Sequence, residues 1–345
     1  MARLRRRRYY IVVAVALFSA AAFAIIAGTN SSGSLHDLSL NLGADLVGTI
    51  LAIFLIAPII ERAELRRDSV LERFDHSKFI RQVAGTRHRV LILELWTDLL
   101  QGSYQARFLA ALGDALQRHV EVRLLLLSPD ARAAEQRADD LLRQTNVVEN
   151  IMDNLLVLHQ FRRNLPDRQQ SKIEVRIYSA LPPVQMYRVD DHVIVSFYPV
   201  NVTSWNAAQY QTNPQAQLGT FVGTKFDELW EAASTRTLDQ YRRVTIEVLD
   251  AAPDGRHQVR FVNHDDEIYL NGRELASRYL DRGIRGLRVR LVDENAKGER
   301  RERLEPYHLV PVAATDQDHA RVAELFTRKY GEERGAVLLR LSPAP

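Results

Sequence analysis

The chain contains no cysteine among its 345 residues, which excludes disulfide bonds, thiolate zinc sites and cysteine nucleophiles. An excess of charge of one sign is also missing. Lys and Arg number 46 and Asp and Glu 43, for a net charge of +3. This balance does not indicate a strongly basic protein that binds nucleic acid. The composition, 46% hydrophobic and 26% charged, is typical of a globular protein.

The common signatures of catalysis and metal binding are missing as well. The sequence has no Walker loop, no G-x-G-x-x-G and no G-x-S-x-G elbow. Its ten histidines show no H-x-x-x-H or H-E-x-x-H spacing. We therefore expect no metal site and no bound cofactor.

Two apolar runs predict a membrane anchor over residues 1–60. The first, at about 9–28, is free of charge over about twenty residues, the length that crosses roughly 30 Å of hydrocarbon. The second, at about 40–60, has Asp45 near its beginning and Pro58 near its end. A cleaved signal peptide is the alternative for the first run, and a buried helix is the alternative for the second.

Basic residues at the outer ends of this pair predict its orientation. A run of arginines, Arg5–Arg8, precedes the first segment, and further arginines follow the second from Arg62. The positive-inside rule then places both termini in the cytoplasm. The sequence therefore predicts a two-pass protein of a bacterial-type inner (plasma) membrane, with the lipid bilayer as a partner. A charged juxtamembrane helix is expected over 61–88.

Residues 89–235 have the pattern of an α/β domain. Buried-type strands alternate with amphipathic helices, which predicts a sheet with helices on both faces. The expected strands are 90–95, 120–127 and 173–178, followed by a short strand pair around Asp190. The expected helices are 103–118, about 130–165 and 223–233, with a polar loop over 203–219.

Residues 240–345 have the pattern of a small antiparallel β domain. Short strands separated by turn signals are expected at 244–249, 259–262, 268–270, 287–292, 309–312 and 337–341. One helix is expected from Asp316 to about Tyr330, where Gly331 stops it.

The order of pieces in residues 78–233 resembles a known family. The strand VLILEL, the strand VEVRLLLL, the pair IEVRIYSALPP and MYRVDDHVIVSFYP, and the closing FDELW helix are similar to phospholipase D-like domains of bacterial proteins of unassigned activity. Catalysis in that family needs the motif H-x-K-x-x-x-x-D. In the matching register Met186 replaces the histidine, Arg188 the lysine and Val193 the aspartate. The resemblance therefore implies a domain with no catalytic residue.

Three side chains remain as candidate ligand contacts, namely Arg188, His192 and Arg176. A guanidinium matches the geometry of phosphate, and adjacent aspartates raise the basicity of His192. Structural salt bridges are the alternative role for the arginines. Glu94, in an otherwise apolar strand, requires a partner if it is buried, and an arginine of a neighbouring strand is expected.

A fainter resemblance concerns the C-terminus. The run DHARVAELFTRKYG before VLLRLSP is similar to the tail of split-barrel flavin- or deazaflavin-binding proteins. That likeness implies that the segment Lys329–Gly331 ends a helix packed on a barrel. The alternative for Lys329 is a helix end with favourable charge.

Together these observations predict an α/β fold with two N-terminal transmembrane helices, then a phospholipase D-like α/β domain and a small antiparallel β domain with one helix. The expected function is a membrane-tethered cytoplasmic sensing or interaction module, non-catalytic, that binds an anionic or nucleotide-like ligand. One phospholipase D-like unit per chain favours a homodimer, because that fold usually builds its site from two units. The alternatives are a phosphodiesterase that uses His192 and Arg188, and a flavin- or deazaflavin-binding protein.

Overall fold

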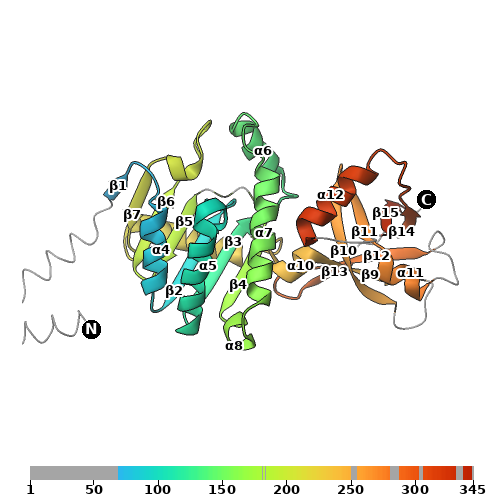
Figure 1. The fold of residues 1–345 in the computed structure, drawn as a ribbon, viewed down its shortest axis with the longest axis horizontal. Helices are drawn as coiled ribbons and strands as arrows, with labels where there is room; N and C mark the ends of the chain where they lie inside the picture. The colour runs from blue at the N-terminus through green and yellow to red at the C-terminus, as the bar shows by residue number, and fades with distance from the viewer. Residues whose placement is uncertain are drawn as a thin grey trace, which may run out of the picture. The chain divides into compact units, whose positions relative to one another are not determined.

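The structure, a computed structural model, describes residues 69–180, 182, 184–249, 255–279, 287–302, 306–331 and 337–343. All of these belong to one compact unit, Asp68–Pro345. Within it, a helix-covered sheet is followed by a small barrel (Figure 1).

The first part is an eight-stranded mixed sheet with the strand order β1-β7-β6-β5-β2-β3-β4-β8. Its strands are β1 (Ser69–Leu71), β2 (Arg89–Glu94), β3 (Glu121–Leu127), β4 (Ile173–Tyr178), β5 (Gln185–Val189), β6 (His192–Ser196), β7 (Gln209–Thr212) and β8 (Arg236–Thr237). Its helices are α4 (His76–Gly85), η2 (Asp98–Leu100), α5 (Gly102–Gln117), α6 (Arg132–Asp140), α7 (Val147–Arg163), α8 (Asp167–Gln170), η3 (Ser204–Asn206) and α9 (Gln217–Trp230).

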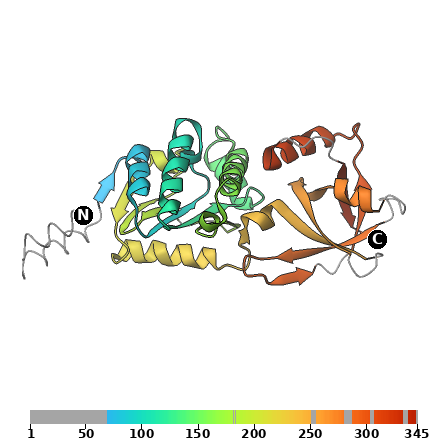
Figure 2. The same ribbon diagram turned by 60° about the horizontal axis from the view of Figure 1, so that its bottom comes forward.

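The centre of this sheet is parallel and buried. Strands β2, β3 and β4 run in parallel, and β5 pairs with β2 in the antiparallel sense. Helices α4, α5 and α7 cover one face, and α9, drawn in yellow, covers the other (Figure 2). Strands buried on both faces carry near-continuous apolar sequence, which is the pattern of RVLILE in β2 and EVRLLLL in β3.

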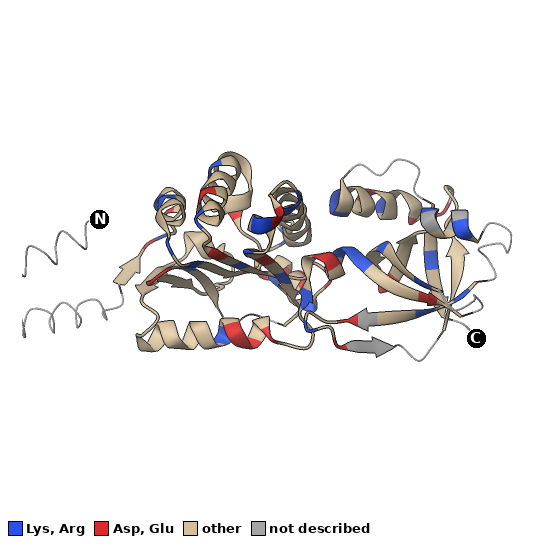
Figure 3. Cartoon of the chain, turned by 90° about the horizontal axis from the view of Figure 1, so that it is seen from below, with Lys and Arg blue, Asp and Glu red and all other residues tan. Residues whose placement is uncertain are grey.

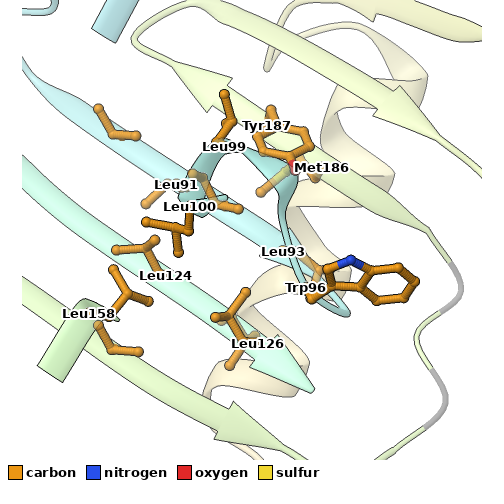
Figure 4. Close-up of a cluster of buried hydrophobic side chains, with 14 of the residues drawn as sticks. Leu91, Leu93, Trp96, Leu99, Leu100, Leu124, Leu126, Leu158, Met186 and Tyr187 are labelled. Atoms are coloured by element: carbon orange, nitrogen blue, oxygen red, sulfur yellow. The ribbon is translucent and has the colours of Figure 1, made fainter. Parts of the chain in front are cut away.

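Leucines of the central strands and helices form most of this core. Side chains of β2, β3, α7 and the turn after β2 interlock, and Met186 and Tyr187 of β5 join them (Figure 4). Met186 is only 1% exposed. Met186, which the sequence resemblance expects in place of a catalytic histidine, is therefore a core side chain.

The second part is a closed antiparallel barrel of six strands. The order is β9-β12-β14-β15-β11-β10, the pairing of β12 with β9 closes the ring, and β13 extends one edge of β12. Its elements are α10 (Leu238–Arg242), β9 (Arg243–Val248), β10 (Arg256–His264), β11 (Glu267–Asn271), α11 (Arg273–Arg278), β12 (Arg288–Glu294), β13 (Arg300–Glu302), β14 (Tyr307–Pro311), α12 (His319–Tyr330) and β15 (Leu338–Pro343).

Helix α12 joins the barrel to the first sheet domain. Its buried face, including Val322 and Phe326, packs on the barrel strands and on Met152 of α7. Arg328 of α12 forms an ion pair with Glu149 of α7 at 3.1 Å. The helix ends at Gly331, whose φ of 84° is in the region that favours glycine.

The predicted fold class with two transmembrane helices is corrected. The two segments, at about 9–28 and 40–60, lie outside the described residues. No helix of the described part is both long and apolar enough to cross a membrane. The longest, α7, has 17 residues, several of them charged, whereas a span needs about twenty apolar ones. The observed fold is α/β with a barrel, and the predictions of a membrane protein and of a two-pass inner-membrane localisation are corrected with it.

The expected juxtamembrane helix over 61–88 differs from the structure in its described part. Residues Ser69–Leu71 form strand β1 at the edge of the sheet, and helix α4 begins only at His76. Asp75 caps α4 by accepting a hydrogen bond from the Lys78 N–H at 2.8 Å. The buried face of α4, with Phe79 and Val83, makes this helix a part of the sheet domain.

Candidate functional site

Arg176, one of the predicted ligand contacts, forms its contacts within its own domain. Its Nε donates to Glu174 at 2.7 Å, and its Nη1 donates to the carbonyl oxygen of Trp230 at 2.7 Å. The guanidinium also lies 4.3 Å from the centre of the Trp230 ring. These contacts attach the end of α9 to strand β4.

Arg188 and His192 lie at the turn between β5 and β6. The Nε of Arg188 donates to the carbonyl oxygen of Asp190 at 3.0 Å, and His192 is exposed. Strands β2 and β3 separate Arg188 on β5 from Arg176 on β4 in the sheet. The structure therefore places Arg188 and His192 at the same turn but does not bring Arg176 to them.

Asp190, between these two residues, has a structural role. Its carboxylate accepts hydrogen bonds from the backbone N–H groups of residues 87, 88 and 89 and from the Thr86 hydroxyl, at 2.9–3.0 Å. Burial alone would raise its pKa, but these donors stabilise the ionised form and lower the pKa. The carboxylate therefore ties the β5–β6 turn to the loop before β2.

The prediction that an arginine pairs with Glu94 is wrong. Glu94 is 1% exposed at the end of β2, and its Oε1 accepts hydrogen bonds from the Tyr198 hydroxyl and the Leu95 N–H, both at 2.9 Å. The Tyr187 hydroxyl lies 3.3 Å from Oε2 and 2.8 Å from the Thr97 hydroxyl. Burial raises the pKa of Glu94 to about 8, although the hydrogen bonds lower it. Burial therefore favours the protonated, neutral form of Glu94, which is closed off from solvent.

A cavity of about 600 Å³ lies at one end of the barrel. The ladder between β9 and β10 ends there, at the pair Arg243–Arg260. Beyond it, the Phe261 N–H donates to the Tyr330 hydroxyl at 2.9 Å instead of to a strand. We call this space the barrel-mouth cavity. Ligand sites are common in the mouths of barrels.

Arginines from five different elements line the barrel-mouth cavity. They are Arg163 of α7, Arg236 of β8, Arg242 of α10, Arg243 of β9 and Arg260 of β10. Only two carboxylates, Asp239 and Glu294, line the same space. Basic positions recur on the barrel strands and on the segment that leads into them (Figure 3).

Two of these arginines are held by the protein, and two others are exposed. Arg242 donates to the carbonyl oxygen of Lys329 at 2.6 Å, and the guanidiniums of Arg242 and Arg260 lie 4.8 and 5.3 Å from the Tyr330 ring. Arg163 and Arg243 are exposed, and no described residue pairs with their guanidiniums. Those two are available to an incoming anion.

Burial, together with nearby arginines, lowers the pKa of two groups beside the cavity. Burial lowers the pKa of His159 to about 4, and Arg242, Arg163 and Arg162 act in the same direction against Asp239. Burial also lowers the pKa of Lys329 to about 7. The Nζ of Lys329 lies 3.7 Å from the centre of the Phe261 ring, behind the cavity wall. Burial, the largest cause of both shifts, disfavours the protonated form of each group.

The sequence contains only weak signals for this site. The arginines are scattered over about a hundred residues, and each resembles an ordinary surface charge. The doublet Arg242-Arg243 at the start of a strand was the nearest signal. Lys329 was expected at a helix end with favourable charge, whereas it is buried, 3% exposed, among aromatic rings. Among the described residues, no group of three His, Asp or Glu is placed to hold a metal ion.

Comparison with known families identifies only part of the first domain. Residues 73–201 match a family described as a domain of unknown function, DUF5919. No curated protein matches the chain.

Solved structures give distant matches. TrmBL2, an archaeal chromatin protein, is 15% identical over 56% of this chain, with a TM-score of 0.34. Phosphatidylserine synthase of Haemophilus influenzae Rd KW20 is 13% identical over 76% of the chain, with a TM-score of 0.35. Polyphosphate kinase of Porphyromonas gingivalis is 12% identical over 55% of the chain, with a TM-score of 0.26. The matches span 64%, 53% and 27% of those proteins, less than two thirds of each. TM-scores this low do not show a shared fold.

Proposed function

We propose that this protein is a non-catalytic sensing module that binds an anionic ligand in the barrel-mouth cavity. The observation that supports it is the convergence of five arginines and only two carboxylates on one cavity of about 600 Å³. Guanidinium groups bind phosphate and carboxylate with matched geometry. Like charges gathered without a ligand repel one another, so an anion stabilises their arrangement.

We also propose that the sheet domain is a degenerate phospholipase D-like domain. The order of its strands and helices along the chain supports this, as does the burial of Met186 where that family has its nucleophile. A thioether can neither attack phosphorus nor carry a proton. In this proposal the domain is the scaffold that presents α7 to the barrel, and one such unit per chain still favours a homodimer.

The phosphodiesterase alternative has no observation in its favour. It would use His192 and Arg188, but His192 is exposed at a turn and Arg188 is bonded to the backbone of Asp190. The proposed module therefore signals by binding rather than by turnover.

The test is direct titration of the full-length chain with inorganic pyrophosphate and tripolyphosphate by calorimetry. We expect binding that weakens with added salt, because the contacts are charged. The double variant Arg163→Ala/Arg243→Ala should weaken binding by about tenfold per arginine, on the order of 1.4 kcal/mol each. Neither guanidinium pairs with a described residue, so the fold should persist.

The matched control is the double variant Arg81→Ala/Arg107→Ala. These arginines are exposed on α4 and α5, and they do not line the cavity. The control removes the same charge and should keep wild-type affinity. The proposal fails if neither anion binds at millimolar concentration, or if the control weakens binding as much as the cavity variant.

A further inference from the structure

The barrel-mouth cavity has an apolar part as well as a charged rim. Val244, Phe261, Ile268 and Leu291 line it, and each belongs to or packs against the apolar core of the barrel. The cavity therefore continues from the arginines to the end of the barrel core. We call this apolar part the throat.

The volume and the charge of the cavity restrict the class of anion. About 600 Å³ is in the range of pockets that enclose organic ligands, and far more than one phosphate needs. Five arginines and two carboxylates give the lining a formal charge of +3, with His159 neutral at pH 7 because its pKa is about 4. A diphosphate group, with roughly three negative charges, complements that lining.

Several uncharged polar side chains also line the cavity, and Asn263 is the one that lies opposite Ile268. Asn263, the residue of β10 opposite Ile268, lines the cavity, and no described residue hydrogen-bonds to its side-chain amide. An amide presents a donor and an acceptor side by side, which matches the edge of a nucleobase. An apolar throat with the Asn263 amide beside it suits a flat heterocyclic ring better than an acyl chain, which needs no hydrogen bond.

We propose that the ligand is a nucleoside diphosphate or a larger nucleotide, with its base in the throat beside Asn263 and Ile268 and its phosphates on Arg163 and Arg243. This inference rests on the proposed function, because it assigns a ligand class to the same cavity. It adds that the organic ring contributes to affinity. The phosphates alone then bind more weakly than the whole nucleotide.

The experiment compares ADP, GDP and UDP with pyrophosphate and with adenosine, each titrated into the full-length chain by calorimetry. We expect at least one nucleotide to bind tenfold or more tightly than pyrophosphate, and adenosine to bind too weakly to measure. The variant Asn263→Ala/Ile268→Ala should weaken the binding of that nucleotide by about tenfold and leave the affinity for pyrophosphate unchanged. Labelling the Ile268 δ1 methyl group gives a second readout, since its NMR resonance should shift with the nucleotide and not with pyrophosphate.

The failure of this inference is distinct from the failure of the proposed function. If pyrophosphate binds as tightly as every nucleotide, the ring makes no contact and the inference is overturned, while the anion-binding function stands. Flavin mononucleotide, which has one phosphate, is titrated in the same way. If it binds more tightly than all three diphosphates, a single phosphate is sufficient and the inference is also overturned. If nothing binds, both proposals fail. A thermal unfolding midpoint equal to that of the wild type establishes that the variant is folded.

Discussion

Buried ionisable side chains of this protein take neutral or aromatic partners rather than opposite charges. Glu94 is surrounded by tyrosine hydroxyls and a backbone N–H, and the ammonium group of Lys329 faces the rings of Phe261 and Tyr241. Burial favours the uncharged form of each group. The pKa of Glu94 accordingly rises to about 8 and that of Lys329 falls to about 7.

The first prediction concerns Glu94. Its pKa is higher in the folded protein than the ordinary value of 4.5. The stability it contributes is therefore complete below about pH 4.5 and is lost as the pH rises through 8. Glutamine is neutral at every pH, so Glu94→Gln should remove this loss. In the wild type, the free energy of unfolding should fall with a slope on the order of 1 kcal/mol per pH unit. Urea unfolding from pH 5 to pH 9 measures it, and a variant that retains the wild-type slope would contradict the assignment.

At the residue scale, the sequence indicates what a side chain needs but not what supplies it. The apolar neighbours of Glu94 show that it is buried and requires a partner. The partner Tyr198 is 104 positions away in the chain and arrives on the loop after β6. No local pattern encodes that contact. An arginine is the usual partner of a buried carboxylate, and it was the wrong expectation here.

At the scale of elements, the agreement depends on how strong the local pattern is. The strand expected at 173–178 is observed at those residues, and the helix expected at 103–118 is observed at Gly102–Gln117. The single helix expected from about 130 to 165 is in fact two, because Leu142 and Arg143 adopt positive φ angles of 53° and 54° between α6 and α7. Neither leucine nor arginine is a residue type that indicates a left-handed backbone conformation.

Strand β7 shows the opposite case, an element without a sequence signal. Its residues, QYQT, are polar and lie within the expected loop over 203–219. The strand forms because β6 and β1 supply hydrogen-bonding partners on its two sides. Tertiary pairing therefore overrides local propensity at this edge of the sheet.

The second prediction concerns the turn between β5 and β6. Asp190 satisfies three backbone N–H groups and one hydroxyl, and it has a φ of 51°, which alanine tolerates less well. Asp190→Ala should lower the free energy of unfolding by about 2 kcal/mol. This loss is smaller than the loss expected for four fully buried hydrogen bonds, because some of these donors reach water. Denaturant unfolding at pH 7 measures the change.

Asp191→Ala is the matched control for this turn. Asp191 is adjacent and exposed, and no described residue hydrogen-bonds to its carboxylate. Its removal should change the free energy of unfolding by less than about 0.5 kcal/mol. Equal losses for the two variants would show that net charge, rather than the capping of residues 87–89, stabilises the turn.

At the scale of the whole molecule, the sequence indicates a β-rich second domain but not its closure. Hairpin signals account for neighbouring strands such as β10 and β11. The barrel closes through the pairing of β12 with β9, elements far apart in sequence. The barrel-mouth cavity exists only because of that closure and because α7 and α12 meet beside it. For this reason the proposed anion site could not be predicted from the sequence, and Arg188, His192 and Arg176 were the candidates instead.

The last prediction couples ligand binding to protonation. His159 lines the cavity, and its pKa is held at about 4 by burial and by the cations of α7 and α10, namely Arg162, Arg163 and Arg242, against Asp239. A bound anion adds negative charge beside it and so raises its pKa in the complex. The complex then binds a proton that the free protein does not, and affinity increases as the pH falls below about 6.5, by at most tenfold per pH unit.

The measurement is the ratio of affinities for pyrophosphate between wild type and His159→Gln, from pH 7 down to pH 5. The anion's own protonation affects both proteins equally, so it cancels in the ratio. We expect the ratio to rise toward low pH, and the wild type to take up more protons on binding than the variant, seen as calorimetric heats that depend more strongly on the buffer. His192→Gln changes an exposed histidine of the other domain and should behave as wild type. A ratio that stays constant over this range would show that the anion binds away from His159, and therefore outside the barrel-mouth cavity.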